Sequence, residues 1–152
     1  MVTMKWILGI TDDELAQIHE IRRTVFIVEQ SIAEEDEIVP WEDEVSQHLI
    51  IYEGDVAVAT GRVLSHEGKF ILGRVAVLKE HRGKGYGKLA VVELIEKALT
   101  MGAAEIEIHA QSYLVEFYQG FGFEICSEEY EEAGIMHFTM VLKGCAGYSR
   151  LK

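Results

Sequence analysis

A glycine-rich turn between an apolar strand and an amphipathic helix constrains this chain more than any other feature. The apolar run is residues 74–78 (RVAVL), and glycines follow at positions 83, 85 and 87. From Leu89 to Leu99, apolar residues recur at three- or four-residue spacing, which predicts a helix. The stretch therefore predicts a strand, a turn of unusual backbone freedom and a helix in direct succession.

Such a turn is suited to holding an anion. Glycine adopts positive φ and lets the backbone approach a ligand closely. The free N–H groups at a helix N-terminus attract negative charge, and the helix dipole adds to that attraction. Because Arg82, Lys84 and Lys88 bring positive side chains to the same place, the turn predicts a phosphate-binding site.

Three other interpretations of the turn fit less well. A Walker loop requires Gly-x-x-x-x-Gly-Lys followed by Ser or Thr, but Arg82 stands at the first glycine position and Leu89 at the hydroxyl position. The dinucleotide-binding fingerprint is met from Gly85 to Ala90, yet residues 79–84 separate it from the strand that it should follow directly. An ordinary strand-to-helix connection does not need three alternating glycines, each of which loses extra entropy on folding.

The pattern Arg-x-x-Gly-x-Gly does fit. Arg82, Gly85 and Gly87 supply it, and residues 75–77 (Val-Ala-Val) precede it. Together they resemble the acyl-CoA-binding motif of the GNAT superfamily of N-acyltransferases. The resemblance implies that backbone amides of the turn hold the CoA pyrophosphate, and that the preceding strand hydrogen-bonds the pantetheine arm.

A second stretch, residues 111–123 (QSYLVEFYQGFGF), resembles the family signature Asn-x-x-Ala-x-x-Leu-Tyr-x-x-x-Gly-Phe. Tyr118 falls on its tyrosine, and residues 122–123 fall on the closing Gly-Phe. Gln111 replaces the asparagine and Leu114 the alanine. Glutamine offers the same hydrogen-bonding groups one carbon further out. The alternative for Tyr118 is a core aromatic whose hydroxyl meets a backbone partner.

Further segments are similar to one bacterial GNAT subgroup, the ElaA-like predicted acetyltransferases. They are residues 21–30 (IRRTVFIVEQ), the Ser-x-His-Leu sequence that begins at Ser46, and residues 132–137 (EAGIMH). The subgroup usually has proline where Met136 stands. With the two signatures, the resemblance spans nearly the whole chain.

The resemblance implies acetyl-CoA as cosubstrate and no metal. The residues expected to contact the cosubstrate are Val75, Ala76, Val77, Arg82, Gly83, Lys84, Gly85, Tyr86, Gly87, Lys88, Gln111 and Tyr118.

It also implies direct attack of an amine on the thioester carbonyl, which a backbone N–H near Val77 polarises as an oxyanion donor does. Tyr118 is the candidate acid for the leaving thiolate. The side chains that could take a proton from the amine are Glu29, His109, Glu132 and His137. Of these, we select Glu29 and His137. Structural roles stay open for all four: Glu29, for example, could pair with Arg22 or Arg23.

Hydrophobic periodicity places the remaining elements. A capping box starts a helix at Thr11, an acidic loop surrounds Pro40, a strand bulge is expected at Gly61, and Ser112 caps a short helix. Strands are expected over 5–9, 47–52, 56–64, 70–78, 105–109, 123–127 and 136–142. This order predicts an α/β (α+β) fold with a mixed, mostly antiparallel sheet and helices on both faces. The GNAT resemblance adds six to seven strands and a central splayed strand pair.

Length and composition indicate one domain. The chain has 152 residues, and 49% are hydrophobic, which is enough for a sizeable core. We place the domain at residues 1–143 and expect residues 144–152 to form a loose tail. No window approaches the roughly 20 apolar residues of a membrane span, and the N-terminus does not resemble a signal peptide. Two cysteines and scattered histidines give neither zinc spacing nor a disulfide framework, so a cytoplasmic location is expected.

The net charge of the chain restricts the classes of molecule that it is expected to bind. Lys and Arg number 14 against 26 Asp and Glu, a net charge of −12, so no nucleic-acid partner is expected. Acidic residues cluster at 34–37, 42–44 and 128–132. A solvated surface is the simpler interpretation; the alternative is a field that attracts a cationic amine.

Three hypotheses for function follow. The first is an N-acetyltransferase that moves an acetyl group from acetyl-CoA to a primary amine of a small molecule or peptide. The second is a non-catalytic acyl-CoA-binding or regulatory module on the same fold. The third is a dinucleotide-binding oxidoreductase domain, which would bind NADH and not CoA. The acceptor stays open, and a homodimer through a sheet edge is compatible with each.

Overall fold

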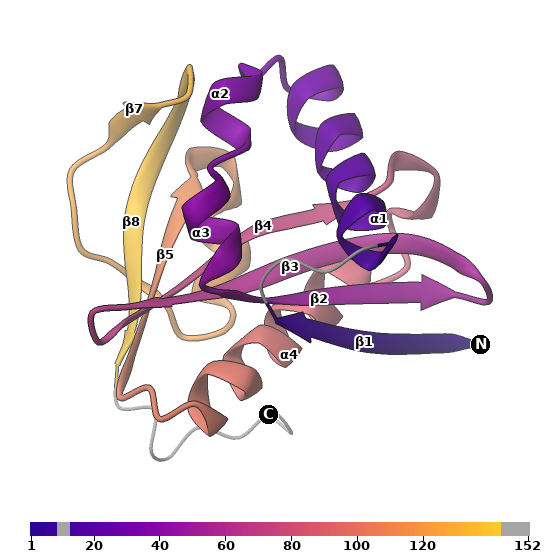
Figure 1. Ribbon diagram of the computed structural model, residues 1–152. Helices are drawn as coiled ribbons and strands as arrows, with labels where there is room; N and C mark the ends of the chain where they lie inside the picture. The colour runs from indigo at the N-terminus through magenta and orange to yellow at the C-terminus, as the bar shows by residue number, and fades with distance from the viewer. Residues whose placement is uncertain (9–12, 144–152) are drawn as a thin grey trace.

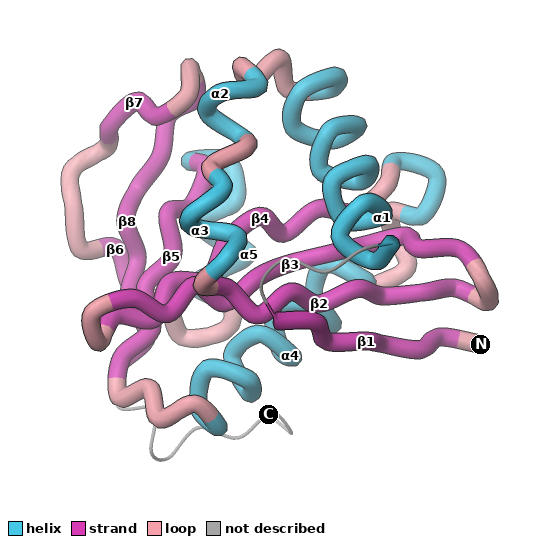
Figure 2. The backbone as a smooth tube through the Cα atoms, viewed as in Figure 1, coloured by secondary structure: helices cyan, strands magenta, loops and turns pink. Residues whose placement is uncertain are grey.

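The computed structural model describes residues 1–8 and 13–143, which form one sheet with helices on both faces (Figures 1 and 2). The helices are α1 (Asp13–Arg22), continued by a π-helical turn (Arg23–Glu29), then α2 (Glu34–Glu37), α3 (Pro40–Glu44), α4 (Tyr86–Thr100) and α5 (Val115–Gln119). The strands are β1 (Val2–Leu8), β2 (Ser46–Glu53), β3 (Val56–His66), β4 (Lys69–Val77), β5 (Glu105–Gln111), β6 (Glu124–Ile125), β7 (Tyr130–Glu132) and β8 (Ile135–Lys143).

The strands lie in the order β1-β2-β3-β4-β5-β8-β6, and β7 pairs with β8. Every pairing is antiparallel except that of β4 with β5. In Figure 1, α1 to α3 lie over one face of the sheet and α4 over the other. The predicted fold class is therefore confirmed. The described residues hold eight strands, because the acidic stretch that includes Tyr130–Glu132 forms the short strand β7 where the sequence predicted a loop.

Strands β4 and β5 splay apart at the centre of the sheet. They pair only at Ile71 with Glu107 and Leu72 with Ile108, although both strands continue beyond these residues. A bulge in β4 accompanies the separation, because the register against β3 shifts between Thr60 and Arg62. Bulges bend the strand that carries them, so the two strands diverge and leave space between their ends.

Gly61 lies opposite this bulge; the sequence predicted an irregularity at Gly61, but the extra residue is on β4. A Cβ there would lie 2.8 Å from Cδ1 of Leu94 on α4, so the glycine lets helix and sheet pack closely. Leu94 is fully buried in the main core. Full burial of a leucine side chain stabilises a fold by about 1.5–3 kcal/mol, which explains why α4 is held firmly against the sheet.

Several local predictions need correction. The acidic loop around Pro40 contains α2 and α3, and proline begins α3 because its fixed φ suits the first helical turn. Ser112 does not cap a helix: its hydroxyl donates to Glu129, 2.7 Å away, and a 3₁₀ turn (Ser112–Leu114) begins there. The predicted strand over 123–127 is reduced to Glu124–Ile125. The Thr11 capping box and the tail at 144–152 lie outside the described residues.

Among the described helices, none combines the length and apolarity needed to cross a bilayer.

Candidate active site

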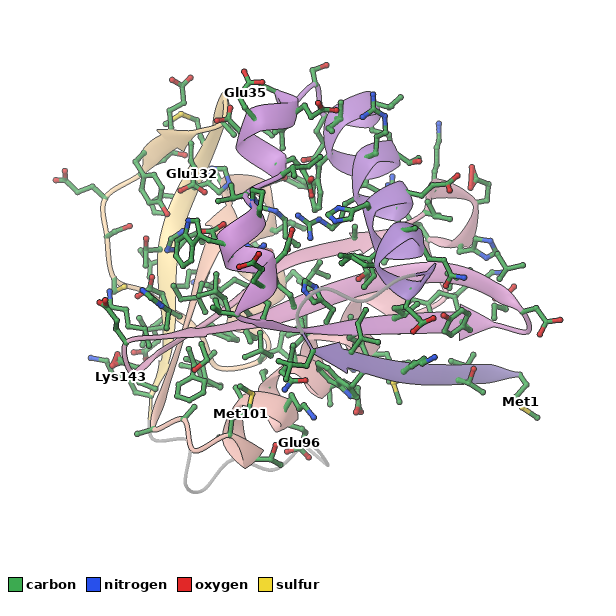
Figure 3. The ribbon with its side chains drawn as sticks, viewed as in Figure 1. Met1, Glu35, Glu96, Met101, Glu132 and Lys143 are labelled. Carbon is green, nitrogen blue, oxygen red and sulfur yellow. The ribbon has the colours of Figure 1, made fainter. Side chains whose placement is uncertain are left out.

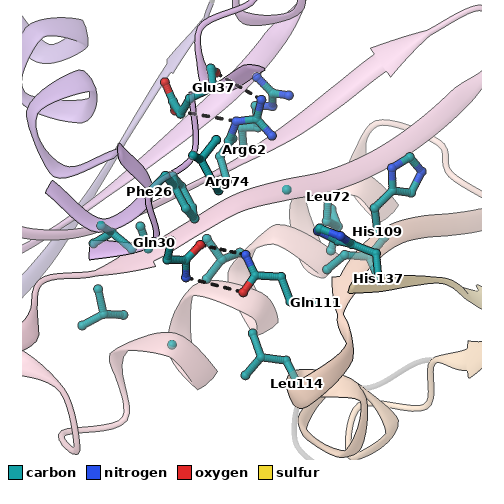
Figure 4. A pocket seen from close by; sticks show the side chains of 18 of the residues that line it. Phe26, Gln30, Glu37, Arg62, Leu72, Arg74, His109, Gln111, Leu114 and His137 are labelled. Atoms are coloured by element: carbon teal, nitrogen blue, oxygen red, sulfur yellow. Dashed lines mark hydrogen bonds and ion pairs between the residues drawn. The ribbon is translucent and has the colours of Figure 1, made fainter. Parts of the chain in front are cut away.

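A cavity of about 1060 Å³ occupies the space between the splayed strands. Its walls come from β4, β5, the π-helical turn, the segment at 34–44, the glycine-rich turn and α5; Figure 4 shows part of the lining. The predicted site residues that line it are Glu29, Val75, Ala76, Val77, Arg82, Gly83, Gly85, Tyr86, Gly87, Lys88, His109, Gln111, Tyr118, Glu132 and His137. Lys84 does not line the cavity, because its side chain pairs with Glu53; Nζ lies 3.1 Å from the Glu53 carboxylate.

The glycine-rich turn presents backbone to this cavity. Gly83 and Gly85 have φ of +82° and +85°, and no atom lies within 4 Å of a Cβ built at either position. Glycine is therefore required here by backbone conformation rather than by space. Helix α4 begins directly after Gly85, whose carbonyl accepts from the Leu89 N–H at 3.0 Å. The N–H groups between these two residues precede the first intrahelical bond, so they are available to an anion.

Arg82 is fixed at the end of β4. Its Nε donates to the Val77 carbonyl at 2.9 Å, and its two terminal nitrogens donate to the two oxygens of Glu29 at 2.9 and 2.8 Å. Glu29 is thus paired with an arginine, as the structural interpretation of this residue expected. Its partner is Arg82, however, and not Arg22 or Arg23. A bidentate pair of this kind has a specific geometry, and it places the guanidinium of Arg82 beside the turn.

Tyr118 lies on α5 with 6% of its surface exposed. Its ring packs edge-on against Phe117 and Phe123, with centroids 5.1 and 6.1 Å away. Burial raises the pKa of the Tyr118 hydroxyl well above its usual range, and nearby Tyr113 raises it further. The hydroxyl is therefore protonated at neutral pH, and Tyr118 lines the cavity.

Two of the candidate bases, His137 and His109, line the cavity in different arrangements. Nδ1 of buried His137 is 2.7 Å from the Ile135 carbonyl, so Nδ1–H donates and Nε2 is the acceptor nitrogen. His109 Nε2 lies 2.8 Å from Glu107 and its Nδ1 lies 3.6 Å from Glu132. The contact with Glu132 is the main cause that raises the pKa of His109, which favours its protonated form.

Gln111 is paired across the cavity. Its Nε2 donates to Oε1 of Gln30 at 2.8 Å, and Gln30 donates in return to Oε1 of Gln111 at 3.4 Å (Figure 4). The additional carbon of glutamine, compared with the asparagine of the family signature, lets the side chain reach the π-helical turn. Gln30 was missed as a site residue: it ends the ElaA-like stretch 21–30, but that resemblance assigned it no role.

A buried ionic cluster lies beside the cavity at α2 and α3, and its members Glu37, Glu42 and Arg62 also line the cavity. Arg22 is fully buried; it contacts the Glu37 carboxylate and donates to Asp43 at 2.8 Å. Arg62 donates to Asp43 at 2.9 Å and to Glu42 at 3.1 Å. Burial alone would raise the pKa of Asp43, but hydrogen bonding to Arg22 and the charges of Arg22 and Arg62 hold it below its usual value. The acidic stretch is thus partly internal, which corrects the expectation of a solvated surface.

Comparison with known proteins agrees with this geometry. The family described as "Acetyltransferase (GNAT) domain" matches residues 13–143. The uncharacterized N-acetyltransferase YjcF of Bacillus subtilis is 34% identical over 139 residues, which cover 91% of this chain and 99% of that protein. Protein ElaA of Escherichia coli is 30% identical over 133 residues, which cover 84% of this chain and 86% of ElaA.

Solved structures show the same fold. The crystal structure of Escherichia coli ElaA superposes with a TM-score of 0.85 at 26% identity, over 94% of this chain and all of that one. A Bacillus subtilis acetyltransferase in complex with CoA superposes with a TM-score of 0.70 at 21% identity, over 93% of this chain and 99% of that one. The domain match and the curated relatives show that this chain belongs to the GNAT acetyltransferase family and is similar to its ElaA-like members.

Proposed function

We propose that this protein transfers an acetyl group from acetyl-CoA to a primary amine. One observation carries the proposal: the glycine-rich turn, the splayed end of β4 and Tyr118 all border a single cavity. A thioester that carries phosphate groups requires two features of its site: an anion-binding turn at one end and a buried proton donor further in. Acetyl-CoA supplies the activated acetyl group; the chain supplies binding, orientation and proton transfer.

The backbone of the turn and of β4 provides the binding surface. N–H groups after Gly85 face the pyrophosphate, with Arg82 and Lys88 beside them. Val75 to Val77 lie beyond the last pairing with β5, so the β5-facing edge of this segment is open to the pantetheine amides. A β4 N–H near Val77 polarises the thioester carbonyl, as oxyanion donors do.

His137 is the base that the arrangement favours. Its Nδ1–H is held by the Ile135 carbonyl, which orients the ring and leaves Nε2 to accept a proton from the acceptor amine. His109 is a weaker candidate because a raised pKa keeps it protonated more of the time. Both oxygens of Glu29 already accept from Arg82, so we assign Glu29 to holding Arg82.

Tyr118 is the proposed acid for the departing CoA sulfur. A tyrosine with a raised pKa gives up its proton reluctantly, so the site must drive the transfer. The same burial that raises the Tyr118 pKa also makes a thiolate in the cavity more basic, because low polarity disfavours both anions. The proton therefore moves as sulfur accumulates charge.

Thiol release from acetyl-CoA with a panel of primary amines tests this proposal. Tyr118→Phe should lower kcat about 100-fold or more while acetyl-CoA still binds. Tyr52→Phe is the matched control, since the Tyr52 hydroxyl bonds to Gln17 outside the cavity lining. Acetyl-CoA binding without thiol release for any amine would support the non-catalytic module instead.

A further inference from the structure

Arg74 occupies an unusual position in the wall of the cavity. Its φ is +51°, a left-handed conformation that is uncommon for residues other than glycine. The residue lies in the β4 bulge, opposite Gly61, and lines the cavity. Strained backbone of this kind persists where the surrounding structure holds it, and it concentrates at functional sites.

The hydrogen-bonding capacity of Arg74 is only partly used. One terminal nitrogen, Nη2, donates to the backbone carbonyls of Asp36 and Glu37, both at 3.1 Å. Nε is buried and has no hydrogen-bond partner within the part of the chain that the structure describes. Guanidinium carries five N–H donors, and across the described residues the other terminal nitrogen, Nη1, makes no hydrogen bond. With 25% of its side chain exposed, Arg74 can still be reached by a ligand.

Among Arg22, Arg62 and Arg74, Arg74 has the positive charge that nearby carboxylates compensate least. Burial and the neighbouring charges of Arg62 and Arg22 lower its pKa to about 10. Glu37 and Asp43 are both engaged by Arg22. The nearest carboxylate oxygen is that of Glu37, 3.7 Å from Nε of Arg74, a contact too long for a hydrogen bond.

A carboxylate lines the same cavity. It is that of Glu132, which Figure 3 shows at the same end of the molecule as the helix that carries Glu35. The contact with His109 is the main cause that lowers the pKa of Glu132, and the charges of His137 and Arg74 contribute further. Arg74, Glu132 and the two histidines thus share one electrostatic field, in a cavity that Phe26 and Ile71 also line.

We propose that Arg74 binds a carboxylate of the acceptor, so that the amines acetylated here are amino acids or other amino-carboxylates. Nη1 donates to the carboxylate while the amine faces Nε2 of His137. This assignment rests on the proposed function. It differs from the cationic acceptor that the alternative interpretation of the acidic clusters suggested, because Glu37 and Glu42, which line the cavity, pair with Arg22 and Arg62.

The test compares matched acceptors with the full-length protein and acetyl-CoA. Glycine, L-phenylalanine, 4-aminobutyrate and 6-aminohexanoate are each assayed against the corresponding carboxamide by thiol release. The carboxylate form should have the larger kcat/KM by about 10- to 100-fold for at least one length, the range expected for a hydrogen bond to a charged group. Equal or higher kcat/KM for every carboxamide would overturn the proposal.

Two variants assign the preference to Arg74. Arg74→Asn removes the charge yet tolerates positive φ, and it should bring the ratio of carboxylate to carboxamide close to one. Arg23→Gln is the matched control: Arg23 pairs with Glu34 at the surface, so the ratio should persist. A ratio that is unchanged in Arg74→Asn contradicts the proposal. If that variant does not fold, the ratio in the wild-type protein decides alone.

A direct binding experiment distinguishes failure of the proposed function from failure of the proposed Arg74 site. If no amine supports thiol release, the CoA-loaded protein is titrated with N-acetyl-L-phenylalanine and with N-acetyl-L-phenylalaninamide. Preference for the carboxylate, lost in Arg74→Asn, supports the anion site although transfer has failed. Equal binding of the two compounds, or binding of neither, rejects the site.

Discussion

The glycine-rich turn at residues 82–88 and the acidic segment at residues 34–44 border the same cavity, but different interactions define them. The turn depends on backbone: two positive φ angles and the first N–H groups of α4. The acidic segment depends on side chains that come from distant parts of the sequence. Arg22 lies 15 residues from Glu37 and 21 from Asp43. One wall can therefore be predicted from local spacing, whereas the other exists only after the chain has folded.

Removal of Arg22 should have the largest effect on stability. Arg22→Met leaves Glu37 and Asp43 buried without their main partner, which should lower the free energy of unfolding by about 3–5 kcal/mol. Chemical denaturation measures the loss. Arg23→Met removes the adjacent exposed pair with Glu34 and should change stability by less than about 1 kcal/mol. Equal losses in the two variants would show that the buried cluster does not hold the acidic segment.

Two alanine substitutions in the turn should have opposite signs. Gly85→Ala places a Cβ at φ +85° and should destabilise the fold by about 1–2 kcal/mol. Gly87→Ala lies within the first turn of α4, where the nearest atom to a Cβ is 3.9 Å away, and should stabilise by up to about 1 kcal/mol. Thermal and urea unfolding measure both. The same sign for the two would contradict a turn defined by backbone conformation.

Two histidines should give stability a pH dependence of opposite sign. Burial lowers the pKa of His48, which is 1% exposed, so its contribution is present above the unfolded pKa and is lost as pH falls below about 6.5. The pKa of His109 is raised, so its contribution is present below about 6.5 and is lost as pH rises through the folded pKa. Each can add a slope of at most about 1.4 kcal/mol per pH unit.

Urea unfolding from pH 5 to 8 separates the two contributions. His48→Gln should remove the loss of stability on acidification, and His109→Gln should remove the loss toward alkaline pH. If the two variants changed the pH profile in the same direction, the assigned environments would be wrong.

The contrast between the glycine-rich turn and the acidic segment also explains which features could be predicted from the sequence. The turn, the strands that flank it and the irregularity at Gly61 follow from local pattern, and the family resemblance supplied the splayed strand pair. Lys84 was expected in the site from its charge and its place in the motif, but its partner Glu53 lies on the distant strand β2. Gln30, the left-handed Arg74 and the inward direction of Glu37 carry no local signal, because each depends on a contact made by the folded chain.

Titration of the protein with acetyl-CoA by isothermal calorimetry tests the central claim, that the backbone of the glycine-rich turn holds the phosphate-bearing cosubstrate. The wild-type protein should bind saturably. Arg82→Ala removes the cation beside the turn, and Gly85→Glu introduces both backbone strain and a negative charge. Each should weaken binding by about tenfold or more, since hydrogen bonds to charged groups contribute about 1.5–3 kcal/mol. No binding by the wild-type protein, or unchanged affinity in both variants, would contradict the account.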